Sequence, residues 1–259
     1  MTEIFRRHWP GDTDRPALAL HCMMASGGYW GPIAGRLEGR IDLYGFDMPG
    51  HGRSGPWEPE ANGPDYHTAV TRIAASFINH PLDLIGHSMG ATVALRIALA
   101  APEAVRSLTL IEPVLFAAAP SEMVAVQPDG DLERLVSEGR DEEATRQFLA
   151  AWGTQSYDAL PNDMQDRMRA CVRLVAACTP DLMHDRANLL REGGLEAITA
   201  PVLLISGKQS PPSIHAIAET LASRLPDVGR AVIPDAGHMA PITHPDQVAG
   251  LIDVNLDRA

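Results

Sequence analysis

Leu82-Asp83-Leu84-Ile85-Gly86-His87-Ser88-Met89-Gly90 is the stretch of this sequence that decides the fold. An apolar run ends at Ile85, two glycines bracket Ser88, and a long apolar segment follows from Ala91 to Ala101. This order predicts a strand, a tight turn and a helix, with glycines where backbones crowd together. The turn holds its serine in a strained conformation, raises the hydroxyl clear of the sheet and places it by a helix N-terminus that favours negative charge.

Short apolar runs alternate with helical spacing on both sides of this turn. The patterns predict strands over 17–21, 41–46, 82–85, 107–111, 201–205 and 231–233, and helices over 29–37, 66–79, 91–101, 213–225 and 245–256. Alternation of this kind is typical of an α/β protein with a mostly parallel, doubly wound sheet that carries helices on both faces.

The stretch from residue 114 to residue 197 breaks this alternation. It contains no convincing strand pattern, and its apolar residues fall on helical stripes, among them Leu132, Leu135, Phe148, Trp152, Met164, Met168 and Cys171. Predicted sheet strands lie on either side of it. We therefore expect a helical lid over 114–197, placed on an α/β core formed by 1–113 and 198–259.

Composition restricts the partners. The chain has 259 residues, 45% of them hydrophobic, which is enough for one α/β domain with an insertion. A formal net charge of -12 argues against nucleic acid and anionic membranes as partners. The sequence has three cysteines, Cys22, Cys171 and Cys178. This low and odd number argues against a disulfide framework.

The sequence also restricts the cellular compartment and the cofactors that we expect. The N-terminus lacks the apolar stretch of a signal peptide, and no segment is long and apolar enough to span a bilayer. The cysteines and histidines show no metal-binding spacing. We expect a cytoplasmic protein that needs no metal and no other cofactor, and the sequence leaves its oligomeric state open.

A serine becomes an effective nucleophile only when a base takes its proton. Of the ten histidines, His238 is the best candidate, because it directly follows the strand over 231–233 and Gly237 permits a turn that brings the imidazole inward. His87 is next to Ser88, but neighbouring side chains diverge at a turn, so its ring should point away from the hydroxyl.

These motifs resemble the α/β-hydrolase family over nearly the whole chain. The residues that carry the resemblance are His21-Cys22-Met23, Asp47-Met48-Pro49-Gly50-His51-Gly52-Arg53-Ser54, the turn at Ser88, and Gly237-His238. The resemblance implies the α/β-hydrolase fold and a catalytic triad in the chain order serine, acid, histidine.

The acid departs from the family's commonest pattern. After the first strand beyond the insertion, the expected carboxylate position holds Ser210, and no acidic residue occurs from Ser206 to Ile217. Some family members place the acid one strand earlier, after the sixth strand of the family, where this chain has Glu112. We expect Glu112 to orient the histidine and stabilise its charged form. The alternatives are Asp235, which would need an awkward loop to meet His238, and a backbone carbonyl.

Acyl transfer also requires hydrogen-bond donors for the oxyanion. The first is the backbone N–H of Met89, which follows the nucleophile at the helix start. Family members usually carry His-Gly-x at the end of the strand that is predicted here over 17–21, and the x residue donates its N–H. In this chain that residue is Met23, with Cys22 in place of the glycine, and Met24 is the alternative.

Taken together, the residues and the resemblance favour a serine hydrolase that cleaves a small carboxylic ester or related acyl compound through an acyl-enzyme. The same triad serves C–C bond hydrolases, thioesterases and lactonases, so these remain alternatives. Relatives that open epoxides or displace halide use an aspartate where Ser88 stands, which disfavours those reactions. An alternative from a different functional class is that the protein is a non-catalytic ligand-binding receptor with the same fold. The small-molecule substrate itself is not specified by the sequence.

Overall fold

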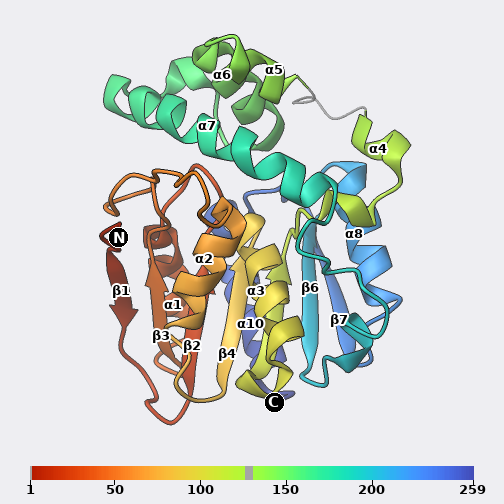
Figure 1. Ribbon diagram of the computed structural model, residues 1–259. Helices are drawn as coiled ribbons and strands as arrows, with labels where there is room; N and C mark the ends of the chain where they lie inside the picture. Colours follow the sequence, from red (N-terminus) through yellow and green to blue (C-terminus); the bar gives the residue numbers. More distant parts are fainter. Residues whose placement is uncertain (1, 126–130) are drawn as a thin grey trace.

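Seven strands form one sheet in the order β1-β3-β2-β4-β5-β6-β7 in the computed structural model, which describes residues 2–125 and 131–259 (Figure 1). Strand β1 is antiparallel to β3, and all other neighbouring pairs are parallel. The central strands are buried on both faces, which explains why they read as continuous apolar runs. The strands are β1 (Arg6–Trp9), β2 (Pro16–Leu20), β3 (Asp42–Phe46), β4 (Leu82–His87), β5 (Val105–Ile111), β6 (Val202–Gly207) and β7 (Val228–Ile233).

Helices cover both faces of the sheet, as Figure 1 shows. The apolar sides of α2, α3 and α8 join one core layer, whereas those of α1 and α10 join the other. Burial of these stripes holds the helices against the strands and keeps the strand ends in a fixed arrangement. The helices are α1 (Gly31–Arg36), α2 (Tyr66–Ala75), α3 (Met89–Ala100), α8 (Pro212–Ala222), α9 (Ala240–Thr243) and α10 (Pro245–Leu256).

Between β5 and β6 the described residues form helices and short 3-10 turns, without a strand. These helices lie across the edge of the sheet at which the parallel strands end (Figure 1). Their apolar stripes pack on one another and on the core, which explains the helical spacing of this stretch. They are α4 (Ser121–Ala125), α5 (Leu132–Ser137), α6 (Asp141–Trp152) and α7 (Asn162–Met183). None of the helices that the structure describes is long and apolar enough to cross a membrane.

Among the described strands, β1 is the one that sequence analysis did not predict. It is short, its residues alternate between exposed and half-buried, and it carries two arginines. Arg7 is bound to the buried carboxylate of Asp47 at 2.8 Å, which ties this edge strand to the loop after β3. Charged residues on an edge strand limit pairing with other chains but remove the apolar pattern that identifies a strand. The strands and helices predicted outside 114–197 agree with the structure to within a few residues, and the short helix α9 was not predicted.

Candidate active site

The turn between β4 and α3 holds Ser88 in the conformation expected from its flanking glycines. Its backbone has φ 58° and ψ -122°, a strained region for a residue with a side chain. The Ser88 N–H donates to the carbonyl of Ile111 at 2.9 Å, which ties the turn to the neighbouring strand. A Cβ atom on Gly86 would clash with the Gly90 carbonyl, and one on Gly90 would clash with the carbonyl of Leu20. Only glycine fits at these two positions.

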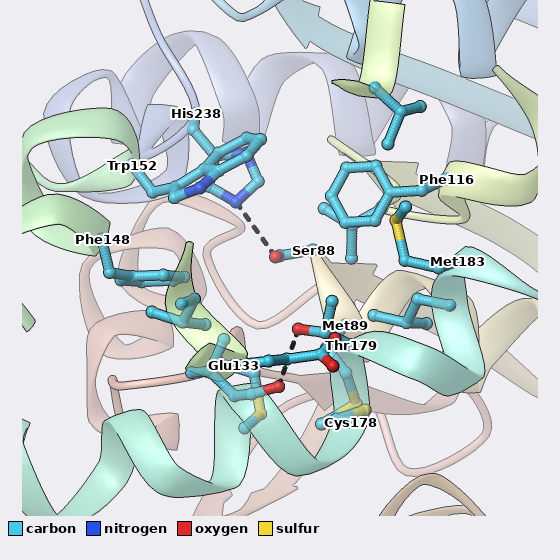
Figure 2. A pocket seen from close by; sticks show the side chains of 16 residues that line it. Ser88, Met89, Phe116, Glu133, Phe148, Trp152, Cys178, Thr179, Met183 and His238 are labelled. Atoms are coloured by element: carbon cyan, nitrogen blue, oxygen red, sulfur yellow. Dashed lines mark hydrogen bonds between the residues drawn. The ribbon is translucent and has the colours of Figure 1, made fainter. Parts of the chain in front are cut away.

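Two consecutive hydrogen bonds join Ser88, His238 and Glu112 into one row of side chains. Figure 2 shows the bond between Ser88 and His238. Ser88 Oγ is 3.0 Å from Nε2 of His238, and Nδ1 of the same ring is 3.0 Å from Oε2 of Glu112. The three residues are nearly inaccessible to water, at 6%, 7% and 0% exposure respectively. Because a carboxylate can only accept, Nδ1 carries the proton and Nε2 is left to accept from the serine hydroxyl.

The second oxygen of Glu112 is also engaged. Its Oε1 accepts hydrogen bonds from the Gly207 N–H at 2.6 Å and from the Ser210 hydroxyl at 2.8 Å. Ser210, which stands at the family's usual acid position, therefore contacts the carboxylate that comes from one strand earlier, β5. Asp235 is exposed, and the ring nitrogen that it would have to reach is bonded to Glu112. The geometry favours Glu112 over Asp235 as the partner of His238.

Met23 and Met89 line one cavity together with Ser88 and His238. Met89 begins α3, where a backbone N–H has no acceptor within the helix. Within the described residues, neither amide makes a hydrogen bond. The Met24 N–H, in contrast, donates to Nε2 of His51 at 3.0 Å. Of the two candidates in the loop after β2, the geometry therefore favours Met23 as the second oxyanion donor.

Two buried histidines hold this loop against the loop after β3. The His21 ring donates from Nδ1 to the Cys22 carbonyl at 2.6 Å and accepts at Nε2 from the Met48 N–H at 2.8 Å. His51 accepts from Met24 in the same way. A ring that donates at one nitrogen and accepts at the other is neutral. Burial, the largest cause, lowers the pKa of His21 to about 3 and that of His51 to about 4.

A third buried histidine joins the loop after β2 to the loop that carries His238. Nε2 of His87 donates to the His238 carbonyl at 2.8 Å, so Nδ1 accepts from the Tyr29 hydroxyl at 2.9 Å. The Tyr29 oxygen in turn accepts from the Cys22 N–H at 3.1 Å. Both ring nitrogens of His87 are thus bonded to groups other than Ser88, which agrees with the expectation that this histidine is not the base. Tyr29 was not predicted, because no motif distinguishes it from a helix residue that packs in the core.

Lowering the pH is expected to destabilise the fold through His21 and His51. Both titrate near pH 6.5 in the unfolded chain, whereas burial lowers their pKa to about 3 and about 4 in the folded protein. Between these values the unfolded chain binds more protons, so stability is present above pH 6.5 and is lost as the pH falls. Each histidine removes up to about 1.4 kcal/mol of unfolding free energy per pH unit. Urea unfolding at pH 7, 6 and 5 measures this slope.

A matched pair of variants separates this effect from the titration of carboxylates. His51→Gln removes one buried ring, and His80→Gln removes an exposed one. We expect the unfolding free energy to fall less steeply with decreasing pH in His51→Gln, and as steeply as in the wild type in His80→Gln. Equal slopes in all three proteins would contradict the assignment of the slope to the buried rings.

Two cavities meet at Ser88. The inner cavity has a volume of about 150 Å³ and the outer one about 360 Å³. Both are lined by Met23, Ser88, Phe148, Trp152 and His238. Figure 2 shows the inner cavity, with Trp152 beside the His238 ring and Phe148 further along the same wall. Both aromatic side chains come from α6, so the helical segment between β5 and β6 forms part of the site.

Among the described residues, the cysteines and the potential metal ligands form no second functional site. All three cysteines are free and buried, and burial raises the pKa of Cys22 to about 12 and that of Cys171 to about 11. These thiols are protonated and act as packing groups. Over residues 2–125 and 131–259, no group of three or more His, Cys, Asp or Glu side chains is arranged to hold a metal ion.

The chain belongs to the alpha/beta hydrolase family, because the model of that family matches residues 17–251. It is 26% identical over 244 residues to the pimeloyl-[acyl-carrier protein] methyl ester esterase of Nitrosomonas europaea, with 90% of this chain and 92% of that protein covered. It is 27% identical over 271 residues to the lipase LipV of Mycobacterium tuberculosis, with 95% of each covered.

A solved structure shares the fold. The enol-lactonase from Burkholderia xenovorans LB400 superposes with a TM-score of 0.73 at 18% identity and covers 99% of this chain and 97% of its own. The predicted fold class, a mostly parallel α/β sheet with helices on both faces, is confirmed. These likenesses identify a hydrolase of the family without specifying its substrate.

Proposed function

We propose that the protein is a serine hydrolase that cleaves a small carboxylic ester, or a related acyl compound, through an acyl-enzyme. The observation that carries this proposal is the buried row in which Ser88 bonds to His238 and His238 bonds to Glu112. The esterase and lipase relatives support the same class of reaction. A protein that only bound a ligand would have no need of this row.

In the first step, Ser88 Oγ attacks the carbonyl carbon while its proton moves to Nε2 of His238. Glu112 accepts from Nδ1 throughout and stabilises the charged ring that forms. The protonated Nε2 then gives its proton to the leaving oxygen, and the carbon–oxygen bond of the ester breaks. Water enters and attacks the acyl carbon while Nε2 of His238 takes its proton. The bond between that carbon and Ser88 Oγ then breaks, Nε2 returns the proton to Oγ, and the acid is released.

The N–H groups of Met23 and Met89 supply the donors for the negative oxygen that forms in each half of the reaction. Backbone amides already held in place require no reorganisation when charge develops, and loss of one such donor raises a barrier by about 3 kcal/mol. The buried histidines that hold the loop after β2 keep the Met23 amide in position.

We propose further that the segment over 114–197 acts as the lid of this site. Its support is the position of α4–α7 across the strand ends, together with the contribution of Phe148 and Trp152 to both cavities. A covering segment excludes water from the reacting groups and shapes the space available to the substrate.

A panel of p-nitrophenyl esters, acyl thioesters and lactones tests the proposed function. We expect steady turnover of short-chain esters by the wild-type protein, exceeding that of thioesters and lactones. Faster turnover of thioesters or lactones would show that the protein is a thioesterase or a lactonase that uses the same three residues. No turnover of any compound by folded protein would contradict the hydrolase and favour a ligand-binding role.

A further inference from the structure

We propose that Tyr29 is a positioning residue of the reaction, whose hydroxyl holds the oxyanion loop in a fixed place relative to the catalytic base. The oxyanion loop is the segment 22–24, which contains the Met23 amide. The proposal rests on the proposed function, because it concerns the charge that develops when Ser88 attacks an ester. Tyr29 acts through the backbone groups of its neighbours rather than on the reacting atoms.

The Tyr29 hydroxyl lies between two loops of the site and is bonded toward both. Its oxygen accepts from the Cys22 N–H at 3.1 Å, one peptide before the Met23 amide. It donates to Nδ1 of His87 at 2.9 Å, and Nε2 of His87 donates to the carbonyl of His238 at 2.8 Å. Three consecutive hydrogen bonds therefore join the backbone beside the oxyanion donor to the backbone of the base.

Burial fixes the direction of each of these bonds. His87 is inaccessible to water, and Cys22 is 2% exposed. Burial, the largest cause in both cases, raises the pKa of Tyr29 well above 10 and lowers that of His87 well below 6.5. The hydroxyl thus keeps its proton and the ring stays neutral near pH 7. A buried donor or acceptor without a partner is unfavourable, so the three bonds are retained together.

Tyr29 is itself held firmly by its own segment, the 3-10 helix η1 (Gly27–Trp30). The Gly27 N–H donates to Oδ1 of the buried Asp47 at 2.9 Å. On the other side of Tyr29, the Trp30 side chain is fully buried in the core. Because the chain is fixed both before and after Tyr29, its hydroxyl provides a stationary attachment point for the two loops.

This attachment complements the other bonds of the oxyanion loop. The rings of His21 and His51 bond the loop to the one after β3, whereas Tyr29 links it toward the base. A backbone donor is most effective at about 2.7–3.1 Å from the oxyanion, so a small shift of the Met23 amide weakens it. The substrate carries no such charge before attack. Loss of the link should therefore raise the barrier without weakening the binding of substrate.

Tyr29→Phe tests this role, because it removes the hydroxyl and keeps the ring. The matched control is Tyr157→Phe, since Tyr157 is also buried, belongs to the 3-10 turn η4 (Tyr157–Ala159) and lines neither cavity. The quantities measured are kcat and KM for p-nitrophenyl butyrate and the Ki of an alkyl trifluoromethyl ketone. Ser88 Oγ adds to the ketone carbon while its proton passes to His238, so this Ki measures stabilisation of an oxyanion.

We expect Tyr29→Phe to lower kcat by about tenfold to a hundredfold, to keep KM within about threefold, and to raise Ki by a factor similar to the fall in kcat. Active sites counted by fluorophosphonate labelling correct kcat for inactive protein. A purely structural role would lower the midpoint of thermal unfolding and leave Ki unchanged. Tyr157→Phe should keep kcat, KM and Ki within about twofold of the wild type.

Two results for Tyr29→Phe would overturn the proposal. If kcat and Ki both stay within about twofold of the wild type, the hydroxyl does not position the oxyanion donor. If KM rises while kcat is unchanged, Tyr29 binds the substrate instead.

A second pair of variants, at His87, tests the same link if Tyr29→Phe does not fold. His87→Gln retains a donor and an acceptor at the end of its side chain, whereas His87→Leu has neither. We expect kcat to fall less in His87→Gln than in His87→Leu, with similar KM in both. Equal losses of kcat in the two variants would overturn the role of the link.

Failure of this proposal is distinct from failure of the proposed function. A wild type that cleaves esters, with a Tyr29→Phe variant that does so equally well, would remove the role of Tyr29 and leave the hydrolase intact. A folded wild type that neither cleaves an ester nor reacts with the fluorophosphonate would refute the hydrolase, and the role of Tyr29 with it.

Discussion

Replacing Ser88 with alanine is expected to lower kcat for ester hydrolysis about a millionfold, to a rate that the remaining oxyanion donors alone support. The physical reason is that the hydroxyl forms the covalent intermediate, and no other nucleophile lies at 3.0 Å from Nε2 of His238 among the described contacts. Alanine occupies the same strained backbone conformation as serine, so the fold should persist. Stopped-flow or long-term p-nitrophenolate release, with thermal unfolding of the same sample, measures both quantities.

His238→Ala provides the internal control for this prediction. If Ser88 and His238 act as one unit, the loss in the double variant should be about the same as in either single variant, because effects within such a unit are not additive. A Ser88→Ala protein that retains kcat within tenfold of the wild type would show that another residue performs the attack.

Glu112→Gln is expected to lower kcat about 10,000-fold while leaving the fold intact, by analogy with removal of the acid in other serine hydrolases. Glutamine has nearly the same shape, but its amide group can donate at the position where Oε2 now accepts from Nδ1. That reversal favours the ring tautomer with its proton on Nε2, which cannot accept the proton of Ser88. The pH dependence and magnitude of kcat, with Asp235→Asn as the matched control, measure the effect.

Ser210 offers a second check on the same assignment. Its hydroxyl is 2.8 Å from Oε1 of Glu112, so a carboxylate at residue 210 would enter the space beside the histidine. We expect Ser210→Asp to restore activity by about tenfold or more in a Glu112→Ala background, since the charge would again support the imidazolium.

Near wild-type activity in Glu112→Gln together with an inactive Asp235→Asn would assign the acid to Asp235 instead.

Much of the fold follows from local patterns. Strands buried on both faces give apolar runs, and the run before Gly86 followed by a helix is enough to place the turn at Ser88. The site residues follow because the carboxyl ends of parallel strands meet at one edge of a sheet. Ser88 directly follows β4 and Glu112 directly follows β5, so their proximity could be predicted once β4 and β5 were taken as neighbours.

The remainder depends on contacts that no local pattern contains. Strand β1 is stabilised by pairing with β3 and by the ion pair of Arg7 with Asp47, neither of which produces an apolar repeat. The hydroxyl of Tyr29 becomes a link between two loops only because packing brings it to His87. The two cavities likewise arise where α6 and α7 meet the strand ends, so their sizes require the three-dimensional structure.

The most direct test of the central claim is the mass spectrometry of protein treated with a fluorophosphonate, which labels only an activated serine. We predict a single adduct on the peptide that contains Ser88, formed about a hundredfold or more slowly in Glu112→Gln because the histidine loses its orientation. An adduct on a different residue, or no adduct on folded wild-type protein, would contradict the assignment of Ser88 as the nucleophile. Equal rates of labelling in both proteins would contradict the assignment of Glu112 as the acid that supports it.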